Sequence, residues 1–172
     1  MSGYQLTKAE RGRLALAVHE VSHALVGVLN GATLLRATLT EGGNDGVCEF
    51  TEDSFTYDHT RYRRALVAAA GPAAAAIFTH GDVPTVRQLD ALLGAGDREE
   101  LRLASLHSYA SSDEQLWAVL PVVRRHWSAI GPLAAKVFAG HAIGHDDVLA
   151  ALEVTNGGGH ESAQLAGLRM GL

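Results

Sequence analysis

The sequence predicts a mostly α-helical fold of the α+β class with one small β-hairpin. Three observations lead to this class. Apolar residues make up 47% of the 172 residues and charged residues 19%, the balance of a chain that can bury a core. Most apolar residues fall in segments long enough for amphipathic helices. A Gly/Asn/Asp cluster at 41–46 separates two short stretches typical of β-strands.

The first predicted element is a long helix over residues 7–29. Thr7 can serve as its N-cap, and Glu10 stands at the capping-box position. The turn residues at 30–32 end this helix. Two short strands are expected next, in "TLLRATLT" and "VCEFTE", because the cluster between them suits a hairpin turn.

A second long helix is expected from Asp58 to Phe78. Its middle is rich in alanine, and side chains that small indicate the close approach of another helix. Pro72 lies within this segment. We expect it to kink or divide the helix, because proline lacks the N–H group that a helix interior needs.

The rest of the main domain is also predicted to be helical. A helix is expected to start at Asp97, after a break at "GAG", and a later amphipathic segment should bend near Pro121 and Pro132. We place a single domain at residues 1–155. Residues 156–172 are expected to form a flexible tail.

Net charge and cysteine content narrow the classes of partner. The formal net charge is −5, and the basic cluster "RYRR" is short, so no nucleic-acid partner is expected. Cys48 is the only cysteine, which excludes an intramolecular disulfide and a four-cysteine zinc site. The apolar run at 14–29 is too short and too interrupted to span a membrane. We therefore expect a soluble, cytoplasmic protein with no membrane partner.

Residues 19–23 read His-Glu-Val-Ser-His, an HExxH pattern within the first predicted helix. Residues four apart share a helix face, so the imidazoles of His19 and His23 can bind one Zn²⁺. Glu20 can then act as a general base beside the metal. Three ionisable side chains in so apolar a helix are costly unless something pairs with them. The pattern therefore predicts a zinc site in a helical, zincin-like domain.

A catalytic zinc needs a third protein ligand and one open position. The extended motif with a third histidine is absent, because Val26 and Leu29 occupy the places of its glycine and histidine. The third ligand must come from elsewhere. The candidates lie in the helices after the second long one: Asp90, Asp97, Glu99, Glu100 and His107.

Three segments resemble the protease domain of the FtsH-type ATP-dependent zinc proteases. "AVHEVSHALVG" resembles their zinc-binding helix, and "RRALVAAAGPAAAAIFTHGDV" resembles the helix that packs beside it. "GAGDREELRLA" resembles their Gly-Ala-Ser-Asn-Asp segment, whose aspartate is the third zinc ligand. The resemblance covers roughly residues 12–110.

The resemblance implies that His19, His23 and Asp97 bind zinc. Counted from Gly71, the family's aspartate falls nearer Asp90, and an insertion is needed to reach Asp97. The local "GA-x-D" context favours Asp97, so Asp90 is kept as the alternative third ligand.

The resemblance also implies an activity and a substrate. Glu20 would be the base of a zinc metalloendopeptidase that cuts peptides or unfolded proteins. No Walker-type nucleotide loop is found, so the expected activity is ATP-independent. An edge strand would pair with the substrate by β-addition. Its residues are Val47, Cys48, Glu49 and Phe50. The oligomeric state is not implied.

Departures from the family pattern leave an alternative function open. The family's Ala-Gly inside HExxH is Val21-Ser22 here, and its Arg and Glu in the second helix are replaced by Pro72 and by Ala75 or Ala76. The alternative is a non-catalytic module with a peptidase fold. Such a module would bind or regulate a peptide or protein partner without cutting it.

Overall fold

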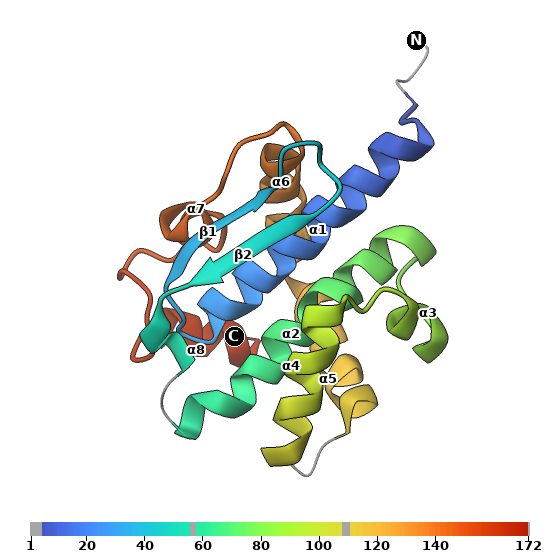
Figure 1. Ribbon diagram of the computed structural model, residues 1–172. Helices are drawn as coiled ribbons and strands as arrows, with labels where there is room; N and C mark the ends of the chain where they lie inside the picture. The colour runs from blue at the N-terminus through green and yellow to red at the C-terminus, as the bar shows by residue number, and fades with distance from the viewer. Residues whose placement is uncertain (1–4, 56–57, 108–110, 172) are drawn as a thin grey trace.

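The computed structural model describes residues 5–55, 58–107 and 111–171. The fold is mostly helical with a two-stranded antiparallel sheet (Figure 1), which confirms the predicted α+β class. The strands are β1 (Leu34–Leu39) and β2 (Gly46–Phe50), followed by the 3₁₀ helix η1 (Glu52–Phe55). The helices are α1 (Lys8–Leu29), α2 (Asp58–His80), α3 (Val86–Ala91), α4 (Ala95–His107), α5 (Ser112–Arg125), α6 (Trp127–Phe138), α7 (His145–Ala151) and α8 (Ala163–Met170).

Helix α1 is the central element (Figure 1). Its predicted capping box is present: the Thr7 N–H donates to the Glu10 carboxylate at 2.7 Å, and the Glu10 N–H donates to the Thr7 hydroxyl at 3.2 Å. From Ala17 to Leu29 every residue except His19 is buried. A helix enclosed on all sides needs apolar residues all round, which explains why so few polar residues interrupt this stretch.

The carboxyl end of α1 is completed by side chains from distant parts of the chain. Its own last turn carries no basic residue. Arg63 of α2 donates to the Asn30 carbonyl at 2.9 Å, and Arg169 of α8 donates to the Leu29 carbonyl at 2.5 Å. Guanidinium groups at this end satisfy carbonyls that have no partner within the helix and balance the helix dipole.

The two strands form the predicted hairpin, in which Ala37 stands opposite Cys48. The outer edge of β1 is closed. Ala37 exchanges two backbone hydrogen bonds with Ile143, of 2.9 and 3.0 Å, and the Leu34 N–H donates to His145 Nδ1 at 3.3 Å. No strand of the described residues pairs with the other edge, along β2.

Helix α2 runs antiparallel to α1 and packs along it (Figure 1). Its alanine-rich middle is buried, as expected from the sequence, and small side chains let the two helices approach closely. The helix continues through Pro72, so the expected division does not occur. Packing against α1 outweighs the loss of one helical hydrogen bond at the proline.

One predicted helix boundary is wrong. Helix α4 begins at Ala95, two residues before the expected start at Asp97. The Arg98 N–H donates to the Gly94 carbonyl and the Asp97 carboxylate accepts the Gly94 N–H, and these two bonds form the first turn ahead of Asp97. The break between α5 and α6 falls at His126, whereas Pro121 and Pro132 both lie inside helices.

Residues 156–172, expected to be a flexible tail, contain α8. This helix is not among the elements expected from the sequence. The Ser162 hydroxyl caps it by accepting the Leu165 N–H at 3.1 Å, and the Leu165 side chain is fully buried in the core. One apolar anchor and one cap are enough to dock a short helix against α1, and a pattern that short is not visible in the sequence.

Candidate metal centre

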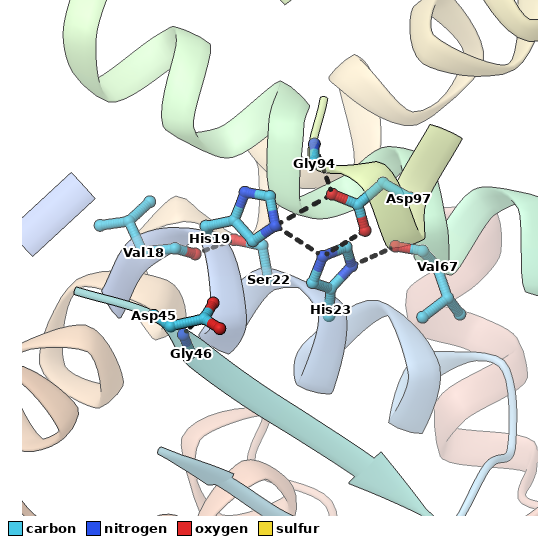
Figure 2. Close-up of polar contacts among 9 residues, drawn as sticks. All are labelled: Val18, His19, Ser22, His23, Asp45, Gly46, Val67, Gly94 and Asp97. Carbon is cyan, nitrogen blue, oxygen red and sulfur yellow. Dashed lines mark hydrogen bonds and ion pairs between the residues drawn. The ribbon is translucent and has the colours of Figure 1, made fainter. Parts of the chain in front are cut away.

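Three side chains from two helices converge on one point (Figure 2). His19 and His23 lie one turn apart on α1, and Asp97 is the third residue of α4. The Nε2 atoms of the two imidazoles are 2.9 Å apart. Each lies 3.2 Å from a different carboxylate oxygen of Asp97. Such a group of donor atoms could hold a metal ion.

A backbone carbonyl of α2 orients His23. The Nδ1–H of its imidazole donates to the Val67 carbonyl at 2.6 Å (Figure 2). This bond leaves the Nε2 lone pair of the neutral ring facing the centre, as is usual for a histidine that binds a metal. Ser22, between the two histidines, is fully buried and donates its hydroxyl to the Val18 carbonyl at 2.7 Å, so it needs no further partner.

Gly71 of α2 packs directly against both imidazoles. A Cβ atom at this position would lie 2.6 Å from His23 Cε1 and 2.7 Å from His19 Cδ2, and closer still to His23 Nε2. Non-bonded atoms do not approach each other this closely, so a side chain at this position would force the histidines or α2 to move. Gly71 and Val67 are one turn apart on α2, so a single face of this helix both orients the histidines and leaves room for them.

Asp97 is held by its own helix end and by a nearby ion pair. Its carboxylate accepts the Gly94 N–H at 3.3 Å, while the Arg98 N–H donates to the Gly94 carbonyl at 3.0 Å. One turn further along α4, the Glu100 carboxylate forms an ion pair with the Arg64 guanidinium of α2, with one hydrogen bond of 2.7 Å. The ion pair joins α2 to α4, and so helps to keep Asp97 over the histidines.

Glu20 lies beside this group and is buried, with 7% of its surface exposed. Burial raises the pKa of Glu20 to about 7, and the charges of Asp97 and Asp45 add to that effect while His23 opposes it. The backbone of Gly46 in β2 lies against the carboxyl group, where a Cβ atom would stand 2.5 Å from Oε1. A carboxyl group with this pKa can exchange a proton near neutral pH.

The charges of the three donor side chains depend on one another. Burial lowers the pKa of His19, although Asp97 opposes the shift. Burial also acts to lower the pKa of His23, but the hydrogen bond and charge of Asp97 outweigh it and the pKa is raised. Burial alone would raise the pKa of Asp97. Its hydrogen bonds to both imidazoles outweigh that effect and hold the pKa well below its usual range.

The donor set fits a cation. The Nε2 lone pair of neutral His23 points at His19 Nε2 and at an oxygen of Asp97, and lone pairs so close repel unless a proton or a cation lies between them. Metal–nitrogen bonds of about 2.0–2.1 Å in a tetrahedral site place two nitrogen ligands about 3.3 Å apart. The distances of 2.9 and 3.2 Å here are close to that spacing.

The three donors open onto a cleft of about 1250 Å³ between α1, α2, β2 and the start of α4. Glu20 and all three donor residues line it. Of the residues predicted to bind substrate, Cys48 and Phe50 line the cleft. Val47 and Glu49 do not, and Glu49 instead pairs with Arg36 at 2.8 Å on the exposed face of the sheet.

The free edge of β2 faces this cleft. Ala37 directs both of its backbone groups to Ile143, so it is a non-hydrogen-bonded partner of Cys48 in the hairpin. In an antiparallel pair of that kind, the N–H and C=O of both residues point away from each other. The backbone groups of Cys48 therefore point to the open edge, where a further strand could pair.

The other candidate third ligands lie elsewhere. Asp90 is exposed and pairs with Arg98 at 2.8 Å, and Glu99 is exposed and pairs with Arg102. Glu100 lines the cleft but is bound to Arg64. The side chain of His107 lies outside the described residues. Asp97 is thus the candidate that the fold brings to the histidines.

Several residues that shape the site were not identified from the sequence as functional. Gly71 and Gly46 permit close contact with the histidines and with Glu20, and the Val67 carbonyl orients His23. The signal available in the sequence was an isolated glycine inside an alanine-rich helix, because glycine is unfavourable there without a packing reason. A backbone carbonyl leaves no signal in its own residue type.

Comparison with protein-family models and with curated proteins finds no match to this chain. The similarity to FtsH-type proteases therefore stays a prediction from motifs. None of the helices in the described part of the chain has both the length and the apolar character that a bilayer crossing requires.

Proposed function

We propose that this protein is an ATP-independent zinc metallopeptidase with a zincin-like fold that resembles the protease domain of FtsH-type enzymes. The observation that carries the proposal is the meeting of two imidazole nitrogens and one carboxylate at the edge of an open cleft, with a buried carboxyl group beside them. Three protein ligands and one open position are the pattern of catalytic zinc sites.

The donor types support zinc over Mg²⁺ and Ca²⁺. Two imidazoles and one carboxylate suit Zn²⁺, whereas Mg²⁺ and Ca²⁺ prefer oxygen ligands only. Zn²⁺ held by His19, His23 and Asp97 would supply a Lewis acid that polarises a carbonyl and lowers the pKa of water to near 7. Glu20 would take a proton from the attacking water and return it to the leaving amine, a role that suits a pKa of about 7.

A peptide in extended conformation suits the free edge of β2. The N–H and C=O of Cys48 would pair with the substrate backbone, and main-chain bonds of this kind are independent of sequence. The opposite edge of the hairpin is closed by Ile143 and His145, so pairing is directed to the side that faces the metal donors. Unfolded protein segments are the substrates that present such a backbone.

Hydrolysis of a disordered protein tests the proposal. We expect the zinc-loaded protein to cleave it, a chelator to stop cleavage, and added zinc to restore it. E20Q should retain zinc and lose at least about 100-fold in rate, as for removal of a general base. E41Q, which changes a carboxylate outside the cleft, is the control and should cleave normally. Full activity in E20Q would refute the role of the base.

The alternative is a module that binds a peptide without cutting it. It is favoured by Pro72 and by Ala75 or Ala76, which stand where the resembling family has charged residues. Pro72 directly follows Gly71, and Ala75 lines the cleft. The two proposals differ in one outcome. Zinc-dependent cleavage by the wild-type protein excludes the binding module, whereas peptide binding with no cleavage at any zinc level excludes the peptidase.

A further inference from the structure

The cleft continues past the metal donors toward the amino-terminal end of α1. Because α1 and α2 are antiparallel, residues that face each other can be followed turn by turn. His23 contacts Val67, and His19 contacts Gly71. One turn further, Ala15 and Leu16 of α1 must face the turn of α2 that carries Ala75, and all three line the cleft.

The side chains of this part of the cleft are mostly apolar, with one hydroxyl from Thr79, one turn beyond Ala75 on α2. Ala15, Leu16 and Ala75 line it. Together with Leu92, which lines the same cleft, we call these four residues the apolar trough. Two of the four are alanines, which leave space where larger residues would fill the gap between the helices. The trough opens at Gly12, where a Cβ atom would meet nothing within 4 Å.

The other end of the cleft differs in chemistry. It is lined by the Arg64–Glu100 ion pair, by Glu52 and by the edge-to-face pair of Phe50 and Phe55. The metal donors thus lie between a charged, aromatic end and the apolar trough. A chain lying across the donors would meet unlike surroundings on the two sides of the bond nearest the metal.

We propose that the apolar trough receives one large apolar side chain of the substrate, next to the bond over the metal donors, and that Ala15 and Ala75 set the size it accepts. This inference rests on the proposed function, because the bond over the metal donors is the one that is cut only if the protein is a peptidase. The trough gains free energy with each carbon that leaves water, and its alanines leave room for a side chain of leucine size. Charged side chains would lose their hydration there without a partner.

Binding to zinc-loaded E20Q tests this without depending on turnover. A series of six-residue peptides that differ only at one central position (Leu, Phe, Ala, Lys or Asp) would be measured by fluorescence polarisation. We expect the Leu peptide to bind about 10- to 50-fold more tightly than the Ala peptide, from the burial of three further carbons. The wild-type protein should cleave the series in the same order.

A protein variant whose trough is filled by a larger side chain tests the same inference with the same peptides. In the E20Q background, A15L should weaken the Leu peptide about tenfold and leave the Ala peptide unchanged. A9L makes the same substitution at an exposed position of α1 outside the cleft and should change neither. If A15L fails to fold, G12L fills the open end of the trough, where a side chain meets no neighbour.

The outcomes separate this inference from the proposed function. Cleavage with no difference between Leu and Ala peptides overturns the trough and leaves the peptidase standing. Discrimination in binding with no cleavage by the wild type keeps the trough and overturns the peptidase. Tightest binding of the Lys peptide, lost in D45N, would assign the trough to a cationic side chain and overturn the inference. No binding of any peptide overturns both.

Discussion

A single methyl group at Gly71 should damage the metal centre. In G71A the new Cβ atom would lie 2.6–2.7 Å from carbon atoms of both imidazoles. Nonbonded carbon atoms require about 3.5 Å, so the rings or α2 must move by roughly 0.8–0.9 Å. Ligand atoms of a metal site must be placed within about 0.2 Å. We therefore expect G71A to lower zinc affinity about 10- to 100-fold, the range for changes that misorient a ligand.

The chain contains a matched control for this substitution. Gly131 also lies inside a helix directly before a proline, but a Cβ atom there meets nothing within 4 Å. G131A therefore carries the same gain in helix propensity and the same clash with the following proline ring. The difference between the two variants isolates contact with the histidines. We expect G71A to be less stable than G131A by about 1–3 kcal/mol, the cost of overpacking.

The assay combines a zinc competition titration against a chromogenic chelator with urea unfolding of the metal-free proteins. G131A should bind zinc as the wild type does. If G71A also binds zinc with wild-type affinity, the histidines do not hold the metal in the arrangement described, and the reasoning fails.

Three further predictions follow from the site and from α1. D97N should lower zinc affinity by at least about 100-fold in the same titration, whereas D90N should leave it unchanged, because Asp97 reaches the histidines and Asp90 pairs with Arg98 at the surface. Burial raises the pKa of Cys48 well above its usual value, with smaller effects from nearby carboxylates. Its thiol should therefore lose its proton only at a higher pH than a free cysteine does, and alkylation by iodoacetamide should be slower than for free cysteine at the same pH. T7A removes the hydroxyl that accepts the Glu10 N–H, and should cost about 1 kcal/mol of unfolding free energy in urea titrations.

Local patterns account for what could be predicted from the sequence. The capping box of Thr7 and Glu10, the hairpin turn and the shared face of His19 and His23 all depend on neighbours within a few residues. The third donor depends on a different kind of information. Asp97 reaches the histidines only because α4 packs on α2, and spacing along the chain does not encode that contact.

What could not be predicted involves close contact between distant backbones. Gly71 against the imidazoles, Gly46 against Glu20 and the Val67 carbonyl on His23 all arise from the final packing of α2 and β2 on α1. The start of α4 at Ala95 was missed for a different, local reason. Helix ends are set by small differences in capping that the sequence pattern does not resolve.

The arginines at the carboxyl end of α1 bear on the order in which the molecule assembles. The contact from Arg63 spans 33 positions and that from Arg169 spans 140. Closing a longer loop costs more chain entropy, and contacts of such separation form late in folding. During synthesis α1 is made before α2 and α8, so its carboxyl end lacks both guanidinium partners until these later helices have folded against it. The helix that carries the histidines is therefore made before the two helices that complete its carboxyl end.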